Sequence, residues 1–554
     1  MSIIKSLIRR TLLNREFLII LAVSVLAFAF KMFLLSQRSL YIDPDEGYYL
    51  ILARNLVHGN GYAFNGLPNI IFPPFLPLAI AFLYVPVHNL QLSLNIITAL
   101  SGTLLGVIAY LIARKKLPVL ASFGCFLLVL FSLQLNSFLP VPVRYTHVLY
   151  RGSDILNCFL VLASVYWTIL LLEKDRYRYA VLAGLTLALA YLTRPEGFIL
   201  WAGLLGLLLL LKFFSAVNVS WKRPACFLVV FAVLTFPYIF YLKTVTGKWM
   251  LSGKVSASQK YRAALLEVIQ KDNWVPFNSI HYALNKSSSE MNDLYFGYHR
   301  ESEEAQVITA EPLAGRILSN LSLFWIIPKT LVPLPFLPFL LLGLGSALHN
   351  VVKKGSRQDL ALLSLVPYSL VVEALSYPIP RHHLFLVPVV ILYSGQGAVL
   401  FSRLLSPKNA ITQRKVFFLV LAVLFILVMY DHIIYSSRNL LNEPAFRAAR
   451  EIEMTISRRL KKAGAEVIMS SHPSFAVWAS SDWQVLPQAS LPRQLVFMRE
   501  KRVDYAVLTE GKRVFYHIFD LRNSQLPERP EDPFAIQTIE TYDYFDLVRV
   551  VKRK

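Results

Sequence analysis

The acidic segment Asp43-Pro44-Asp45-Glu46 holds the residue types in this chain that most directly point to chemistry. It follows a long apolar stretch at residues 17–36, where a membrane-spanning helix would be leaving the bilayer. Charge is costly in hydrocarbon, so these carboxylates are expected at the water interface or in a hydrated cavity. Carboxylates grouped in such a place can remove a proton from a hydroxyl group or bind a cation.

The composition predicts the elements that must position these acids. The chain has 554 residues, of which 55% are hydrophobic and only 16% are charged, whereas soluble domains carry about 25% charged residues. Apolar runs recur at the length of about 20 residues that a helix needs to cross a bilayer. We therefore expect a mainly α fold, a polytopic transmembrane helical bundle. The formal net charge of +22 is explained by basic loops between spans, so no nucleic acid is expected as a partner.

Eleven spans are expected, with a basic side and an outer side. They lie at residues 17–36, 91–113, 119–139, 155–172, 179–193, 197–214, 225–242, 331–349, 360–377, 384–402 and 416–435. Lysine and arginine in the short segments gather on the side of the N-terminus, as in Arg114-Lys115-Lys116, and this side is normally cytoplasmic. The sequence therefore predicts a multi-pass protein of the plasma (inner) membrane with a cytoplasmic N-terminus and an extracytoplasmic C-terminus.

The outer side is expected to carry three long regions. Residues 70–88 are apolar but rich in proline, and a span there would reverse the charge bias, so we expect a surface-lying or re-entrant segment within a first outer loop, 37–90. A second long outer loop covers residues 243–330. The tail alternates helix and strand patterns, with helices near 443–463 and 492–501 and strands near 466–470, 503–508 and 535–550. We therefore predict two domains, a membrane domain at 1–436 and a small soluble α/β domain at 437–554.

An outward-facing site restricts the choice of substrate. Nucleotide-activated substrates are made in the cytoplasm, so an outward transferase needs a donor that has already crossed, and a lipid phosphate meets this need. Such a site requires cations for the phosphate and a carboxylate to accept a proton from the attacking hydroxyl. Ionisable residues near the outer ends of the spans could supply both. They are the acidic segment, Arg144, Arg151, Asp154, Arg194, Glu196, Arg381, His382 and His383.

These residues occur in stretches that resemble a known family. The stretch from Tyr41 to Gly59, with Asp45-Glu46 and Ala53-Arg54-Asn55-Leu56 inside it, resembles the first outer loop of the GT-C glycosyltransferases. The similarity is to the branch of protein O-mannosyltransferases and lipid A aminoarabinose transferases, and it extends over roughly residues 17–400. Three further stretches agree with that branch: Ser153-Asp154-Ile155, Leu192-Thr193-Arg194-Pro195-Glu196-Gly197 and Arg381-His382-His383-Leu384-x3-Pro388.

The resemblance implies glycosyl transfer from a polyprenyl-phosphate sugar, with inversion at the anomeric carbon. It implies that Asp45 is the catalytic base, that Glu46 orients nearby groups and that Asp154 is a second carboxylate. The implied substrate-binding residues are Asp43, Tyr49, Arg54, Arg194, Glu196, Arg381 and His382. Asp43 adds an acid before the usual pair, and His382 stands where the family commonly has tyrosine. The acceptor could be a glycan, a lipid or a protein.

Several alternatives remain open from the sequence. Asp43, Asp45, Glu46 and Asp154 could cap helices, and Arg194 with Glu196 could be a satisfied interfacial pair. A divalent cation, Mg or Mn, could be held by Asp45 and Asp154, although no ligand spacing establishes it. In place of a transferase, the chain could be a transporter or flippase of lipid-linked saccharide, or a membrane scaffold that displays its tail.

Overall fold

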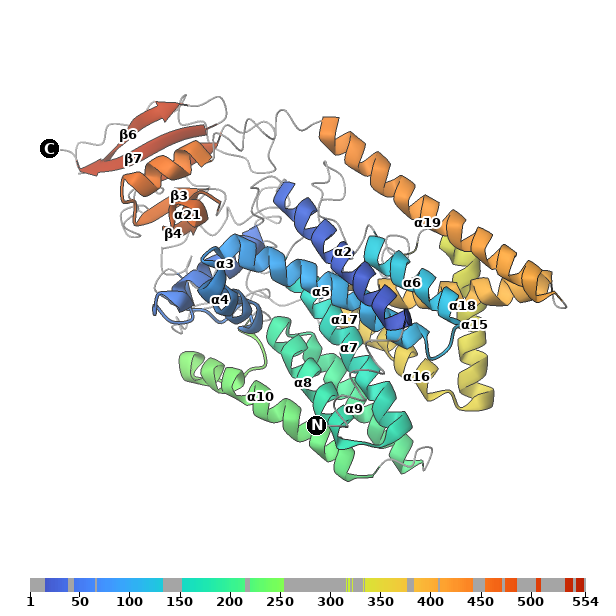
Figure 1. Ribbon diagram of the computed structural model, residues 1–554. Coiled ribbons are helices and arrows are strands. Elements are labelled where there is room, and N and C mark those ends of the chain that lie inside the picture. Colours follow the sequence, from blue (N-terminus) through green and yellow to red (C-terminus); the bar gives the residue numbers. More distant parts are fainter. Residues whose placement is uncertain are drawn as a thin grey trace, which may run out of the picture. The chain divides into compact units, whose positions relative to one another are not determined.

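In the computed structural model in Figure 1, the elements of the described residues are helices, one small sheet and a short hairpin. It describes residues 15–37, 44–64, 67–132, 152–214, 220–253, a few positions between 315 and 332, 334–375, 383–406, 409–441, 454–470, 474–485, 505–509, 534–541 and 545–552. The chain forms two compact units. The first unit comprises residues 1–38, 91–237 and 312–441, and the second unit comprises residues 39–90, 238–311 and 442–554.

The first unit is built from apolar helices, most of them long. They are α2 (Arg15–Gln37), α5 (Leu90–Ala113), α6 (Val119–Phe131), α7 (Ser153–Lys174), α8 (Tyr177–Thr193), α9 (Gly197–Phe213), α10 (Lys222–Thr246), α15 (Leu337–Lys354), α16 (Arg357–Leu363), α17 (Leu365–Leu375), α18 (Leu386–Leu405) and α19 (Ala410–Leu441). A 3-10 turn, η2 (Leu334–Phe336), leads into α15. The last turns of α10, from Tyr238 on, belong to the second unit.

Each of the eleven predicted spans contains a described helix, although part of the span at 119–139, from residue 133 on, lies outside the described residues. Seven described helices are long and apolar enough to cross a membrane. The predicted span at 360–377 is divided into α16 and α17, and the division falls just before Pro367, which has no backbone N–H for a helical hydrogen bond. The prediction of a polytopic helical membrane protein is confirmed, whereas its orientation and the identity of the membrane stay predictions.

Two glycines allow α15 and α18 to approach closely. A Cβ atom on Gly343 would lie 1.9 Å from the carbonyl oxygen of Tyr393, and one on Gly397 would lie 1.8 Å from that of Phe339. Each glycine therefore faces the backbone of the other helix. Close contact of this kind is how apolar helices associate inside a bilayer, where there is no hydrophobic gain from leaving lipid.

The second unit begins with α3 (Pro44–Val57), the hairpin β1 (Ala63–Phe64) and β2 (Leu67–Pro68), and α4 (Phe75–Val87). Helix α4 is the stretch that we expected to be surface-lying or re-entrant. It has 13 residues, fewer than the about 20 that a span requires, and it contains Pro86. Its depth relative to a membrane stays a prediction.

The tail forms the predicted α/β domain. Its sheet has the order β4-β3-β5-β7-β6, in which β3 (Val467–Ser470) is parallel to β4 (Asp482–Val485) and β5 (Tyr505–Thr509). Strand β7 (Phe545–Lys552) is antiparallel to β5 and to β6 (Phe534–Thr541). Strand β4 and the short helix α21 (Ser474–Ala479) were not predicted. The described part of the first predicted tail helix is 454–462, and the helix predicted at 492–501 lies outside the described residues.

The core of this α/β domain includes part of the first predicted outer loop. Ile51 and Leu52 of α3 are buried in one cluster with Ile456, Ile468 and Phe475 of the tail. Residues more than 400 positions apart in the chain thus share one core, and α3 folds as part of the second unit. The functional domains at 1–436 and 437–554 stay a prediction.

Candidate active site

The acidic segment leads into α3. The helix begins at Pro44, and proline is well suited to the first turn because the N–H groups there have no helical partner. Asp45 therefore lies in the first turn, where negative charge is favourable. The side chain of Glu46 is fully buried, with 0% exposure. The side chain of Asp45 and the whole of Asp43 lie outside the described residues.

Tyr49 lies one turn further along α3 and is packed among aromatic rings. It is 5% exposed and meets Phe72 edge-on, with 5.1 Å between the ring centroids. Tyr48 stacks on Phe72, with 5.1 Å between the ring centroids, and meets Trp483 edge-on, with 5.4 Å between the centroids. The structure thus places Tyr49 in the core of the second unit, and its predicted contact with substrate stays a prediction.

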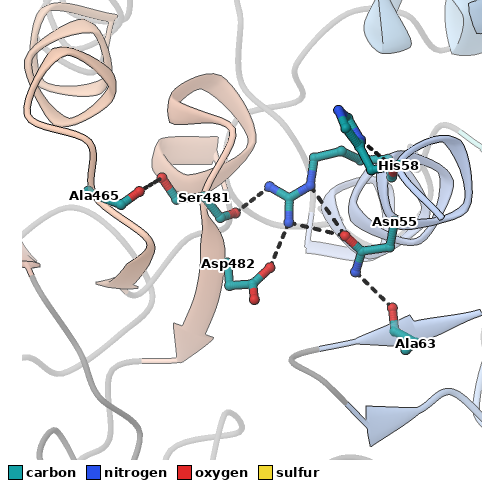
Figure 2. A network of polar contacts seen from close by, with 7 residues as sticks. Asn55, His58, Ala63, Ala465, Ser481 and Asp482 are labelled. Carbon is teal, nitrogen blue, oxygen red and sulfur yellow. Dashed lines mark hydrogen bonds and ion pairs between the residues drawn. The ribbon is translucent and has the colours of Figure 1, made fainter. Parts of the chain in front are cut away.

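Arg54 connects α3 to the tail. Figure 2 shows the surrounding polar network, in which Arg54 Nη1 donates to the carbonyl oxygen of Ser481 at 2.5 Å and Nη2 donates to Asp482 Oδ1 at 2.7 Å. Nε and Nη2 also approach Asn55 Oδ1, each at 3.4 Å. Burial lowers the pKa of the guanidinium, and the charge of Asp482 opposes that shift. A guanidinium has five N–H donors, and most of these already have protein partners.

The contacts of Arg54 therefore describe a structural role. Asn55 extends the same network, because its Nδ2 donates to the carbonyl oxygen of Ala63 in the hairpin at 2.9 Å. Ser481 Oγ donates to the carbonyl oxygen of Ala465 at 2.8 Å. The network holds together α3, the hairpin and the beginning of β4. Binding of donor phosphate by Arg54 stays a prediction.

Three predicted residues meet in the first unit. Asp154, in the first turn of α7, forms an ion pair with Arg194 Nη1, and Arg194 Nη2 lies 3.3 Å from Glu196 Oε1. Asp154 and Arg194 are 3% and 6% exposed. We call these three residues the Asp154 cluster. The predicted pairing of Arg194 with Glu196 is present, and the contact with Asp154 was not foreseen.

The turn between α8 and α9 positions the arginine. Arg194 ends α8 in an extended conformation, with φ −147° and ψ 129°, and Pro195 follows it. The chain then turns so tightly that a Cβ atom on Gly197 would lie 2.5 Å from the backbone nitrogen of Tyr191. A glycine is therefore required at the start of α9 for the guanidinium to reach α7.

The Asp154 cluster limits what its carboxylates can hold. Two acids share one guanidinium, so Asp154 already has a buried cationic partner. Among the described residues, no group of three or more His, Cys, Asp or Glu side chains could hold a metal ion. Asp45 and Asp154 belong to different units, and the Asp45 side chain is not described. A divalent cation shared by these two aspartates therefore stays a prediction.

The third predicted stretch is described only from His383 onward, because Arg381 and His382 lie outside the described residues. His383 is fully buried, and its two ring nitrogens lie 2.6 Å from Ser369 Oγ and 2.8 Å from Glu373 Oε2. Ser369 and Glu373 were not singled out from the sequence. The available signal was Glu373, the only acidic or basic residue of the predicted span at 360–377, with Ser369 four positions before it and thus on the same helix face.

The structure thus shows two groups of candidates. Glu46, Tyr49 and Arg54 lie along α3 in the second unit. The Asp154 cluster joins α7 to the α8–α9 turn in the first unit.

Comparison with solved structures identifies the fold. The structure of ArnT from Cupriavidus metallidurans bound to undecaprenyl phosphate matches with a TM-score of 0.56, over 96% of this chain and 97% of that chain, at 13% identity. The oligosaccharyltransferase of Archaeoglobus fulgidus, tethered with an acceptor peptide containing the NVT sequon, matches with a TM-score of 0.52 over 88% of this chain and 69% of that chain, at 15% identity. A structure of the same archaeal enzyme in complex with Zn and sulfate matches with a TM-score of 0.51 over 87% and 67%, at 14% identity.

At 13–15% identity, these matches show that the chain shares the fold of the solved structures. No protein-family model and no curated protein sequence matches the chain. The two solved proteins are GT-C glycosyltransferases, and this chain shares their architecture along nearly its whole length. The resemblance to the GT-C fold that the sequence motifs suggested is therefore confirmed.

Proposed function

We propose that this protein is a membrane glycosyltransferase that moves a sugar from a polyprenyl-phosphate-linked donor to an acceptor outside the cytoplasm. The observation that carries the proposal is the shared fold, over 96% of the chain, with ArnT bound to undecaprenyl phosphate. The positions of the carboxylates support it. One group opens α3, which lies within the first predicted outer loop, and a second opens α7, which follows a segment that the charge bias assigns to the outer side.

In the proposed reaction, Asp45 accepts the proton of the acceptor hydroxyl as the oxygen attacks the anomeric carbon. The bond from that carbon to the phosphate oxygen breaks, and the polyprenyl phosphate leaves with the bonding electron pair. A single displacement of this kind inverts the anomeric centre. Glu46 lies directly beside the base on α3 and is fully buried, so it can hold neighbouring groups in place.

The leaving phosphate needs cationic partners. Arg194 lies beside a proposed catalytic carboxylate, and a guanidinium has five N–H donors, so those that remain after its contacts with Asp154 and Glu196 would donate to the phosphate. Asp154 would hold this guanidinium in place and neutralise part of its positive charge. Arg381 and His382 are proposed as further phosphate contacts on the resemblance alone, and Asp43 is proposed as an alternative base.

A divalent cation is a separate part of the proposal. Mg or Mn prefers carboxylate oxygens and would stabilise negative charge on the phosphate. Chelation followed by readdition tests this part: activity that EDTA removes and Mg or Mn restores supports a metal, and unchanged activity in EDTA contradicts it.

The main experiment measures transfer of a radiolabelled sugar from synthetic polyprenyl-phosphate donors by the purified protein in lipid nanodiscs. Asp45→Asn keeps the size of the side chain but removes its basicity, so transfer is expected to fall by about 10²–10⁴-fold, the usual contribution of a general base. The matched control is Asp175→Asn, because Asp175 ends α7 in a left-handed conformation that asparagine also tolerates.

The outcome of this assay distinguishes a glycosyltransferase from a flippase. Loss in Asp45→Asn with normal activity in Asp175→Asn supports the mechanism. Full activity in Asp45→Asn removes Asp45 from it. Movement of an intact lipid-linked saccharide across the bilayer of reconstituted vesicles, without transfer to any acceptor, would instead support a flippase.

A further inference from the structure

Three polar side chains form a hydrogen-bonded network inside the first unit. The imidazole of His383 lies between Ser369 and Glu373, with Nδ1 2.6 Å from the hydroxyl oxygen and Nε2 2.8 Å from Oε2 of the carboxyl group. All three residues have 0% exposure. Ionisable groups buried within a membrane bundle are costly and usually serve a function. The proposed reaction does not use them directly.

The network gives each ring nitrogen of His383 a polar partner, and no lysine or arginine among the described residues hydrogen-bonds to it. Glu373 Oε1 is buried without a hydrogen-bond partner in the described part of the chain, so the carboxyl group contacts the network through Oε2. An amide at position 373 can make the same contact with Nε2, because its NH2 group donates and its oxygen accepts.

The network determines where α17 lies. Ser369 and Glu373 are four positions apart and thus on one face of this helix, and a single imidazole contacts both. Beside them, the ring of Tyr368 packs against Phe385, with 4.8 Å between the centroids. The polar network and the aromatic pair together fix α17 to the start of α18, so that α17 can neither rotate nor slide without breaking contacts.

Helix α17 in turn reaches the Asp154 cluster. It packs against α9, the helix that begins directly after Glu196. The α8–α9 turn that carries Arg194 and Glu196 leads directly into α9, so the position of α9 sets where this turn lies. A shift of α17 therefore changes the surroundings of the Arg194 guanidinium.

We infer that Ser369, His383 and Glu373 are positioning residues that act through the packing of α17 on α9 to hold the Asp154 cluster in its geometry. The predicted effect on the rate of sugar transfer rests on the proposed function. The predicted effect on the packing of α17 does not.

The kinetic test compares Glu373→Ala with the conservative Glu373→Gln. Misplacement of reacting groups by about 1 Å can cost about 10²-fold in rate, so kcat per folded molecule is expected to fall about tenfold to hundredfold in Glu373→Ala. In Glu373→Gln it is expected to stay within about threefold of the wild type, because the amide still donates to His383. His349→Ala, at an exposed position of α15, is the control and should leave kcat unchanged. Wild-type kcat in Glu373→Ala would overturn the inference.

The structural test does not require activity. It compares the melting temperatures of Tyr368→Phe, Glu373→Ala and the double variant in nanodiscs. Coupling through α17 predicts that the melting temperature of the double variant falls by less than the sum of the decreases in the two single variants. For Tyr368→Phe combined with His349→Ala, the decreases in melting temperature should be additive. Additive losses for Tyr368 and Glu373 would overturn the inference. A wild type that transfers no sugar would contradict the proposed function, and these melting temperatures would still decide the positioning role.

Discussion

The ion pair between Arg54 and Asp482 allows two roles of this arginine to be separated. The resemblance to GT-C enzymes implies that Arg54 binds donor phosphate, whereas its contacts connect α3 to the tail. The informative variants are Arg54→Ala, Asp482→Ala and the double variant. A structural connection predicts that both single variants weaken the same packing, whereas phosphate binding predicts that only Arg54→Ala affects the donor.

The expected sizes follow from burial. The side chain of Asp482 is 41% exposed, so solvent screens the pair, and its coupling energy is expected to be about 0.5–1 kcal/mol. Arg54 is only 11% exposed and also donates to the Ser481 carbonyl oxygen. Hydrogen bonds from charged groups contribute about 1.5–3 kcal/mol, so Arg54→Ala is expected to reduce the free energy of unfolding by about 2–4 kcal/mol. Asp482→Ala removes mainly the screened attraction and should cost about 1 kcal/mol.

The assay combines denaturant unfolding of the second unit, followed through the fluorescence of Trp483 and Trp478, with the donor KM of each variant. Arg458→Ala is the control, because Arg458 lies exposed on the tail helix 454–462. A structural role predicts a smaller effect of Asp482→Ala once Arg54 is already alanine. If Arg54→Ala leaves stability unchanged and raises the donor KM more than tenfold while Asp482→Ala changes neither, the structural reasoning is refuted.

Two further predictions concern the first unit. Gly343→Ala and Gly397→Ala would each place a methyl group within 2 Å of a carbonyl oxygen of the facing helix, so each should destabilise the α15–α18 contact by about 1–3 kcal/mol or more, whereas Gly345→Ala meets nothing within 4 Å and should be neutral in the same thermal melts. Asp154→Ala leaves Arg194 buried with one carboxylate fewer, and breaking such a pair costs about 3–5 kcal/mol. A melting temperature equal to that of the wild type would show that the Asp154 cluster is solvated.

The bundle could be predicted from the sequence because hydropathy is a local property. A run of about 20 apolar residues must satisfy its backbone hydrogen bonds internally in lipid, and a helix does so whatever its neighbours are. The strands of the tail were predicted where short runs of apolar and β-branched residues are clear, as at β3, β5, β6 and β7. Strand β4 and helix α21 are only 4 and 6 residues long, too short for a periodic signal.

The candidate site could be predicted only in part. Motifs pointed to Asp154, Arg194 and Glu196 one by one, and the pairing of Arg194 with Glu196 followed from their closeness in sequence. The ion pair between Asp154 and Arg194 spans 40 positions and depends on how α7 packs beside the α8–α9 turn. Ser369 and Glu373 could not be predicted as a pair because their common partner is His383. This histidine follows the end of α17 and contacts them only in the folded bundle.

Amino-acid order alone thus decides that this chain is a helical membrane protein with acids at the beginnings of α3 and α7, since helix formation in lipid and the cost of buried charge act over short stretches. The choice of partners belongs to the tertiary structure. Arg54 and Asp482 are 428 positions apart, and no local rule connects them. Which cation meets which carboxylate, and which of them remains for a substrate, is determined by packing, because a buried charge is stabilised by whatever group the fold places within about 3 Å of it.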